Sequence, residues 1–374
     1  MSVNRPHGGV LINRIVQKQN IPHTSATIEI DEMAANDLEL IANGAYSPLD
    51  GFMAKEDYES VIKRMRLKNG LVWSMPITLP VDEKTARTLQ KGKMAKLIYN
   101  DETYGVINVQ ELYEPNKEKE AVYVYGTSNR NHLGVKRLFA RPNIYVAGKI
   151  SLIKRLKKSF PEYHFDPFET RIKFKQLGWK TIAGFQIDNV MNRTDEYLQK
   201  VVLEIVDGLF VHPLISDPKQ SVFHVDALIE SYEQLFNKFY PQERVWFALF
   251  PAVMRFAGPK EAIFHAIVRK NYGCTHFVIG PDYASAGSDY GTYDAQKLAS
   301  LYEEEIGIDI LNFKRCFYCK LCQQIASEKT CPHNRKYHIV LTDENIQAMV
   351  KDEDYPSTEL IRPEVIQVLK TYLK

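Results

Sequence analysis

Several features that would assign the chain to a narrow class are missing from its 374 residues. No apolar run approaches the ~18 residues that cross a bilayer, so no membrane partner is expected. Neither charge sign dominates, because 48 Lys and Arg stand against 46 Asp and Glu, for a formal charge of +2. Proteins that coat nucleic acid usually carry a large basic excess, so no nucleic-acid partner is expected either. The first ten residues lack the apolar core of a signal peptide, which predicts a cytoplasmic protein.

Cysteine is scarce too, and its placement argues against a disulfide framework. Four of the five cysteines fall between positions 316 and 331, whereas disulfide-stabilised domains spread theirs along the chain. A Cys-x-x-Cys pair can bind one Zn²⁺ from a single turn, and a later Cys and His can complete a tetrahedron. The spacing therefore predicts a structural zinc site made by Cys319, Cys322, Cys331 and His333.

Other interpretations of this cluster stay open. His338 is the reserve fourth ligand in place of His333. A [4Fe–4S] cluster fits the spacing less well, and four reduced thiols without metal are the remaining alternative. Four protein ligands leave no open position for a substrate, so we expect a structural role rather than a catalytic one.

The hydrophobic pattern changes near residue 165. Before it, short runs rich in β-branched and aromatic residues predict a helix at 56–64 and strands at 73–79, 95–99, 104–109 and 121–125. After it, predicted strands at 181–187, 208–214, 245–250 and 276–280 alternate with predicted helices at 194–206, 225–239, 260–271 and 293–305. Such alternation is typical of an α/β fold with a parallel sheet, where ligands bind at the carboxyl ends of the strands.

Several segments resemble the ATP sulfurylase family, and the resemblance extends over nearly the whole chain. They are residues 5–9, 46–52, 126–128, 178–181, 204–209, 251–280 and 290–296, together with the cysteine cluster. The resemblance implies a PUA-like β-rich domain at 1–165, a Rossmann-like nucleotidyltransferase domain at 168–310 and a small zinc-bearing domain at 311–374. It also implies a homo-oligomer that converts MgATP and sulfate to adenosine 5′-phosphosulfate and pyrophosphate.

The resemblance further implies three substrate loops, and this chain departs from the family in each. The family motifs are Gln-Thr-Arg-Asn for sulfate, His-x-x-His for the triphosphate and Gly-Arg-Asp-His for the nucleotide. Their counterparts here are Gln186-Ile187-Asp188-Asn189, Asn192-Arg193-Thr194-Asp195 and Gly280-Pro281-Asp282-Tyr283. The resemblance thus assigns substrate binding to Gln186, Asp188, Asn189 and Arg255, catalytic positions to Asn192, Arg193 and Asp195, and nucleotide binding to Gly280, Asp282 and Tyr283.

These substitutions change the charge where anions would bind. Unit charges ~4 Å apart at an effective dielectric near 20 interact by about 4 kcal/mol, so Asp188 in place of arginine turns attraction into repulsion. Loss of one preorganised donor costs ~10²–10³ in rate, and here three histidines and two arginines are absent. Sulfate is therefore not expected as a good ligand, and Mg-ATP is a ligand only if nucleotide binding is retained. Arg193 is the candidate substitute cation.

Three functions remain open, so whether the chain is an enzyme is not decided by its sequence. The preferred hypothesis is a protein with strongly reduced or lost sulfate adenylyltransferase activity, non-catalytic or regulatory. The second is an active nucleotidyltransferase with another acceptor, because Asp188 and Asp195 favour a cationic group or a bridging Mg²⁺. The third is an ordinary sulfate adenylyltransferase that tolerates the changes.

Overall fold

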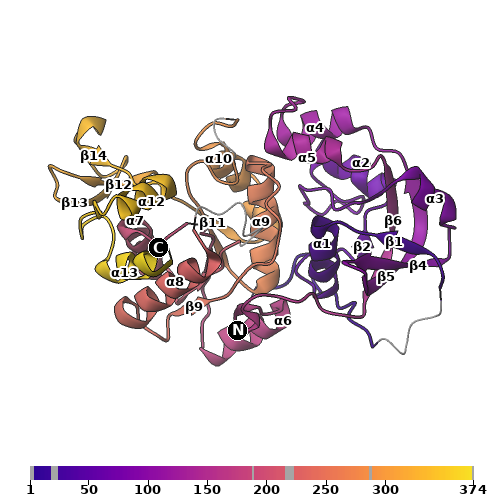
Figure 1. Cartoon of the computed structure of the whole chain (residues 1–374), viewed down its shortest axis with the longest axis horizontal. Helices are drawn as coiled ribbons and strands as arrows, with labels where there is room; N and C mark the ends of the chain where they lie inside the picture. The colour runs from indigo at the N-terminus through magenta and orange to yellow at the C-terminus, as the bar shows by residue number, and fades with distance from the viewer. Residues whose placement is uncertain (1–3, 18–23, 188, 215–222, 286–288, 373–374) are drawn as a thin grey trace.

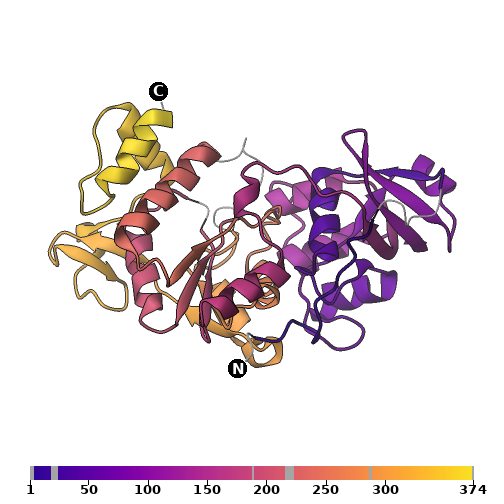
Figure 2. The ribbon, with the colours of Figure 1, turned by 90° about the horizontal axis from the view of Figure 1, so that it is seen from below.

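Two lobes lie side by side along the long axis of the computed structural model (Figure 1, Figure 2). The structure describes residues 4–17, 24–187, 189–214, 223–285 and 289–372. Among these residues, no helix combines the length and the apolar character that crossing a bilayer would require.

The N-terminal lobe is built on a six-stranded sheet in the order β1-β4-β5-β6-β2, with β3 paired to β6. β1 runs parallel to β4, and the other pairs are antiparallel. The strands are β1 Thr27–Glu29, β2 Gly51–Phe52, β3 Leu79–Val81, β4 Met94–Tyr99, β5 Glu102–Tyr113 and β6 Ile144–Leu152. The helices of this lobe are α1 Glu32–Ala42, α2 Lys55–Arg64, α3 Glu83–Thr88, α4 Lys117–Tyr125 and α5 Leu133–Ala140.

Two of the four strands predicted in this lobe are correct, and so is the helix at 56–64. The strand predicted at 121–125 is wrong, because these residues form the second half of α4. The side chain of Asn116 caps that helix by accepting the N–H of Lys119, and Gly126 ends it at φ 72°. Of the strand predicted at 73–79, only Leu79 belongs to a strand.

The second lobe holds a five-stranded parallel sheet in the order β11-β10-β7-β8-β9, which confirms the predicted α/β arrangement. Its strands are β7 Ile182–Phe185, β8 Gly208–Val211, β9 Val245–Phe247, β10 His276–Ile279 and β11 Asp309–Asn312. Its helices are α6 Pro167–Gln176, α7 Arg193–Leu203, α8 Val225–Phe239, α9 Pro259–Tyr272, α10 Asp294–Ser300 and α11 Glu303–Ile306. The strand order reverses between β7 and β10, the place where open α/β sheets form ligand crevices.

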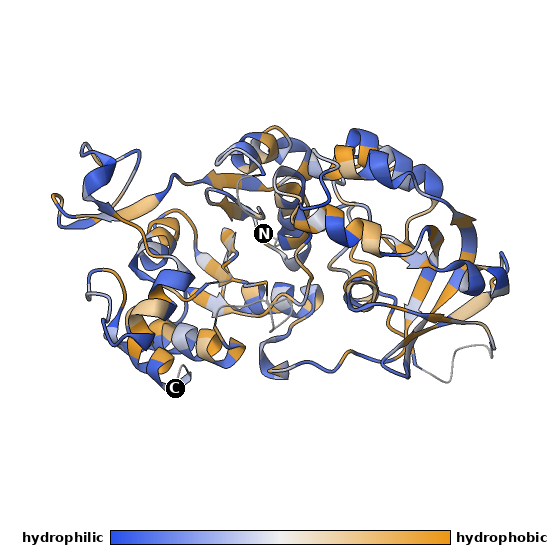
Figure 3. Cartoon of the chain, turned by 45° about the horizontal axis from the view of Figure 1, so that its top comes forward, coloured by the Kyte–Doolittle hydropathy of each residue, from blue (hydrophilic) through white to orange (hydrophobic). Residues whose placement is uncertain are grey.

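Successive residues of these buried strands pack on opposite faces of the sheet. Ile182 and Phe210 join a core with α6 and α9, whereas Ala183 and Val211 join a core with α7 and α8. Hydrophobic and hydrophilic residues both occur on the helices (Figure 3), and on α8 the apolar Leu228, Ile229 and Leu235 are among the buried residues. Helices therefore cover both faces, which leaves the carboxyl edge of the sheet as the place for a site.

The C-terminal residues form two structural pieces. A three-stranded sheet in the order β13-β12-β14 comprises β12 Cys316–Cys319, β13 Gln324–Ser327 and β14 His338–Ile339. The helices α12 Asp343–Lys351 and α13 Pro363–Tyr372 instead add Ile346 and Leu369 to the core around α8. The predicted domains 1–165, 168–310 and 311–374 stay predictions. The helices α12 and α13 of the third one share a core with the parallel sheet of the second.

A buried ion pair joins the two lobes. Arg255, in the loop after β9, places its Nη2 atom 2.5 Å from Oδ1 of Asp37 on α1. Their side chains are only 8% and 3% exposed. The ring of Phe264 on α9 also packs against Tyr46 and Trp73, with ring centroids 4.9 and 5.4 Å apart. A charge in this setting is stable only with its partner.

Replacement of Asp37 by Ala should lower the free energy of unfolding by about 3–5 kcal/mol, because it leaves the Arg255 guanidinium buried without its counter-charge. Urea titration would measure the loss. The matched control is Glu83→Ala, which breaks the exposed pair with Arg87, where both side chains are about four-fifths exposed. That change should cost under about 0.5 kcal/mol. Equal losses in the two variants would contradict the role of the buried pair.

Candidate functional site

A cavity of about 490 Å³ lies at the carboxyl edge of the parallel sheet. Residues that follow four of its strands line this cavity: Gln186 and Ile187, Pro213 and Leu214, Gly280 to Ser285, and Phe313. Met254 and Phe256 reach it from the loop after β9. Described residues of the loops 186–195 and 251–258 therefore face one cavity, at the carboxyl ends of the strands, where the α/β pattern predicts a ligand site.

The charged groups on the cavity wall are acidic. Asp195, Asp282 and Asp343 line it, and no Lys, Arg or His occurs among the described lining residues. The rest of the wall combines aliphatic and aromatic side chains, Tyr232 and Tyr283 among them, with the uncharged polar residues Gln186, Asn189 and Ser285. The described side chains of this wall therefore provide no positive charge to bind a polyanion such as a triphosphate.

The first turn of α7 lies at this wall and is closed by a capping box. Oδ1 of Asn192 accepts the backbone N–H groups of Thr194 (2.8 Å) and Asp195 (3.3 Å). Oδ2 of Asp195 in turn accepts the N–H of Asn192 at 3.1 Å. The N–H of Arg193 donates to the backbone oxygen of Leu360 at 2.9 Å. Helix N-termini bind phosphate through N–H groups of this kind, and here the chain itself uses all four.

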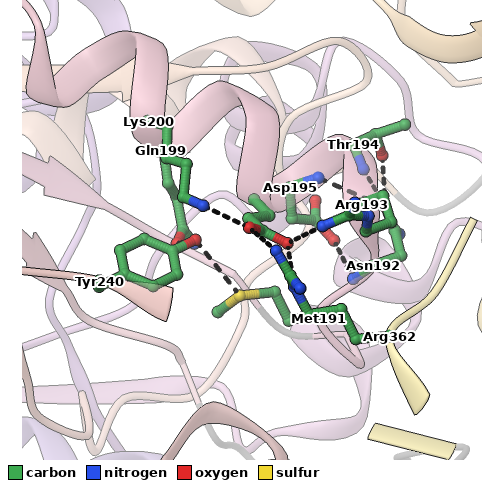
Figure 4. A network of polar contacts seen from close by, with 10 residues as sticks. Met191, Asn192, Arg193, Thr194, Asp195, Gln199, Lys200, Tyr240 and Arg362 are labelled. Atoms are coloured by element: carbon green, nitrogen blue, oxygen red, sulfur yellow. Dashed lines mark hydrogen bonds and ion pairs between the residues drawn. The ribbon is translucent and has the colours of Figure 1, made fainter. Parts of the chain in front are cut away.

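Arg193 is held in an ion-pair network centred on Glu196 (Figure 4). Its Nη1 atom lies 2.9 Å from Oε2 of Glu196. Arg362 from the start of α13 donates two hydrogen bonds of 2.7 Å to the same carboxylate, and Lys200 approaches to 2.5 Å. Burial acts to raise the pKa of Glu196, but the bonds from Arg362, Lys200 and Arg193 outweigh it and lower that pKa to about 2. Arg193, the candidate substitute cation, is thus already paired with Glu196 on its own helix.

The residues of the first predicted loop have separate roles. Oε1 of Gln186 accepts hydrogen bonds from Nη2 of Arg269 (2.9 Å) and from the hydroxyl of Tyr283 (2.8 Å). The Nδ2 atom of Asn189 lies 3.2 Å from Oδ2 of Asp195. Asp188, predicted to bind substrate, lies outside the described residues.

The loop predicted to bind the nucleotide, residues 280–283, follows β10. Gly280, Pro281, Asp282 and Tyr283 all line the cavity. Asp282 adopts a left-handed φ of 51° and forms an ion pair with Arg315. Pro281 has no N–H to donate, so this loop lacks both the charge and the backbone donor that an arginine would supply there.

Arg255 does not lie on the described cavity wall. Its guanidinium points into the interface between the lobes, where it meets Asp37 and the sulfur of Met33. The role in substrate binding that the family resemblance assigns to Arg255 stays a prediction.

The cysteine cluster has the geometry of a metal centre. One ligand atom each from Cys319, Cys322, Cys331 and His333 lies within 4.8 Å of the others. Nδ1 of His333 is 3.5, 3.3 and 3.7 Å from the three sulfurs in that order. Ligand atoms around a tetrahedral zinc with ordinary bond lengths would be about 3.5–3.8 Å apart. The four residues could therefore hold a metal ion without rearrangement.

Comparison with known proteins supplies the family. The ATP-sulfurylase family model matches residues 161–372, and the model of the PUA-like domain matches residues 4–155. The chain is 46% identical over 372 residues to a sulfate adenylyltransferase of Chloroflexus aurantiacus, covering 99% of this chain and 97% of that protein. It is also 46% identical over 377 residues to a sulfate adenylyltransferase of Halothermothrix orenii, covering 98% of both.

The chain belongs to the ATP-sulfurylase family. The N-terminal lobe of this ATP-sulfurylase family member is thus PUA-like, and its parallel-sheet lobe is of the nucleotidyltransferase type. Among solved structures, a hexameric APS kinase from Thiobacillus denitrificans shares the fold, with a TM-score of 0.77 at 20% identity. That match covers 98% of this chain and 68% of the other.

Some cavity residues had no signal in the sequence. Asp343 at the start of α12 lies on the wall, and its Oδ1 is 3.3 Å from the backbone nitrogen of Val190, 153 positions away. Tyr232 on α8 reaches the same wall and donates to the backbone oxygen of Asn189 at 2.5 Å. Neither residue falls in a motif of the ATP-sulfurylase family that the sequence displays, so only the packing of α8 and α12 reveals them.

Replacement of Glu196 by Gln should lower the free energy of unfolding at pH 7 by about 2–3 kcal/mol. The pKa of Glu196 is depressed in the folded state, so its contribution is present above the ordinary value of 4.5 and is lost as the pH falls toward about 2. Denaturant titrations from pH 3 to pH 7 should thus show the two proteins converging in acid.

The control for this comparison is Glu204→Gln, at the exposed C-terminal end of the same helix. Its stability difference from wild type should stay within about 0.5 kcal/mol at every pH. A loss in Glu196→Gln that does not change with pH would contradict the electrostatic explanation.

Proposed function

We propose that this ATP-sulfurylase family member has strongly reduced or no sulfate adenylyltransferase activity. The observation that carries the proposal is the first turn of α7, whose N–H groups are bound by Asn192, Asp195 and Leu360. A triphosphate at this place would have to displace the chain's own acceptors. It would also meet the carboxylate of Asp195 where the family motif has a histidine.

The charge of the cavity wall supports the same proposal. Three aspartates line the described part of the wall, while Arg193 is paired with Glu196 and Arg255 with Asp37. Transfer to a sulfate dianion depends on charge neutralisation around both anions. The relatives compared above are named as sulfate adenylyltransferases, so their names do not support a loss of sulfate binding. The proposal that this chain binds sulfate poorly therefore rests on the charges of its cavity.

A second candidate function is adenylyl transfer to an acceptor other than sulfate. The observation that favours it is the cavity of about 490 Å³, with Gln186, Asn189 and Asp195 among the residues of its wall. A non-catalytic chain has no need of such a space, whereas a Mg²⁺ ion bound by aspartates could bring a nucleotide into it. Under either candidate we expect a homo-oligomer, as the family resemblance implies, and a cytoplasmic location, as predicted from the N-terminal sequence.

Pyrophosphate release from saturating MgATP and sulfate should be far below ~1 s⁻¹, the lower end of the usual enzyme range. The assay is run beside a version with Asp188→Arg, Asn192→His, Asp195→His, Pro281→Arg and Tyr283→His. Sulfate-dependent turnover that appears only in this version would support loss of function at this site. Wild-type turnover of ~1 s⁻¹ or more would contradict the proposal and restore the ordinary sulfate adenylyltransferase.

We also propose that the metal centre holds one structural zinc per chain. Three thiolates and one imidazole are the soft donors that zinc prefers, and four protein ligands close the coordination sphere. The sheet that carries the cysteines contacts α7 through β12 and β13, so this zinc would support the helix that borders the cavity. His338 stacks on Phe317 at 3.5 Å between ring centroids, which suits a packing role better than a fourth ligand.

Elemental analysis of untagged protein should give close to one zinc per chain. A Cys331→Ser variant should lose that zinc and unfold its C-terminal sheet first, because metal-binding energy is folding energy here. Cys274→Ser is the control, since this buried thiol lies outside the cluster, and it should retain the metal. Metal-free wild-type protein with unchanged stability in a chelator would contradict the assignment.

A further inference from the structure

Three polar side chains form a path from the cavity wall into the core. Tyr283 is one of the residues that line the cavity, and its hydroxyl oxygen is 2.9 Å from Nδ1 of His265. Nε2 of the same imidazole is 3.6 Å from Oε1 of Glu261, one turn earlier on α9. The His265 and Glu261 side chains are 1% and 0% exposed, so the path meets the cavity only at Tyr283.

The buried end of this path can take up a proton near neutral pH. Burial raises the pKa of Glu261 to about 7, although the N–H groups of Arg255 and Ala257 bind the carboxylate and act in the other direction. Burial, with Arg269 and Arg255 nearby, holds the pKa of His265 well below its usual value. A neutral imidazole between the two can receive a proton at Nδ1 while it releases one from Nε2.

The cavity end of the path is fixed in position. The hydroxyl of Tyr283 also lies 2.8 Å from Oε1 of Gln186, and that oxygen keeps a second bond from Nη2 of Arg269. The hydroxyl proton can therefore move to His265 without leaving Gln186 unsatisfied. Tyrosine stands here where the family motif has histidine, so the resemblance does not assign this arrangement.

We propose that Tyr283 is a catalytic proton acceptor, backed by His265 and Glu261 as positioning residues, and that the acceptor substrate of this cavity carries an O–H or N–H group. The inference rests on the second candidate function, in which the cavity binds MgATP and the acceptor is not sulfate. A sulfate dianion has no proton to lose at neutral pH, so its adenylylation needs no base. A hydroxyl or amine must lose a proton as it attacks phosphorus, and a base within hydrogen-bond reach removes it.

The step balances in atoms and electrons. The acceptor oxygen or nitrogen forms a bond to the α-phosphorus of ATP, and the bond from that phosphorus to the bridging oxygen breaks. Pyrophosphate leaves with the electron pair of the broken bond. The acceptor proton passes to the oxygen of Tyr283 and the Tyr283 proton to Nδ1 of His265, and the Nε2 proton passes to Glu261 when their 3.6 Å separation shortens to hydrogen-bond distance. The products are the adenylylated acceptor and pyrophosphate.

Several charged and titratable groups surround the path, and one of them, Arg255, is paired with Asp37, whose pKa burial raises. Glu261 interacts with Arg255 from the loop after β9 and with groups from four other elements: Tyr46, Tyr125, Arg137 and Tyr290. The four-residue set contains three tyrosines whose pKa values burial raises above the usual value, and an arginine that stays protonated. A pH dependence near 7 therefore reports on the path itself.

The test measures pyrophosphate release from MgATP with water, glycerol or ethanolamine as the acceptor, in the absence of sulfate. Wild-type protein should release pyrophosphate faster with glycerol or ethanolamine than with water alone. The rate should rise with pH through about 7 and then level off. Tyr283→Phe should lower the rate ~10²–10⁴-fold, with the KM for ATP changed less than about threefold.

Two further variants separate proton transfer from structural damage. Glu261→Gln keeps the shape of the side chain and should abolish the rise in rate near pH 7. Tyr163→Phe, which removes a hydroxyl paired with Glu233 outside the cavity wall, should behave as wild type. If Glu261→Gln fails to fold, the comparison of wild type with Tyr283→Phe still decides the question.

Each outcome bears on one proposal. Absence of acceptor-dependent release, an unchanged rate in Tyr283→Phe, or a flat pH profile in wild type would overturn the proton path. A parallel arm with sulfate alone tests the proposed function, which a sulfate-dependent rate of ~1 s⁻¹ or more would contradict. A low rate with sulfate and no release with the protic acceptors would leave the proposed function standing and refute the path.

Discussion

The first turn of an α-helix has N–H groups that must find acceptors, and in α7 the chain supplies those acceptors itself. Asn192 and Asp195 close the turn, and Leu360 takes the N–H of Arg193. The same residues stand where the family motif has its two histidines. Helix N-termini bind phosphate through such N–H groups, and in this turn the groups already have acceptors from the chain.

The neighbouring ion pairs reinforce that change. Glu196 forms ion pairs with Arg193 and Lys200 on its own helix and with Arg362, so the bonds from Arg362 join α7 to the residue before α13. Arg255, a matching residue of the family, is in turn held at the lobe interface by Asp37. The cations that the sequence offers near the cavity are thus used for stability, while aspartates remain on its wall.

Helix α9 packs in the core shared with the N-terminal lobe, and two of its side chains bind residues that line the cavity. Ile263, Phe264 and Ile267 belong to the core that continues into the N-terminal lobe. Glu261, His265 and Arg269 lie on the same helix and are buried as well, and they lead toward Gln186 and Tyr283. Because nearly every residue of α9 is buried, a change on one side of this helix is transmitted to the other.

The sequence by itself determined the α/β class, the parallel sheet, the cysteine cluster and the departures in three loops. Periodicity and short motifs are local signals in the sequence. They therefore predicted strands such as β7 and β10 and the cluster from Cys319 to His333. The sequence pattern did not predict that residues 121–125 are helical. Their composition favours a strand, but the caps Asn116 and Gly126 stabilise them as part of a helix. Only the tertiary structure decided which charges face the cavity. Arg193 and Arg255 were candidates for anions from their positions, but their partners Glu196 and Asp37 are chosen by packing between elements, which no local pattern records.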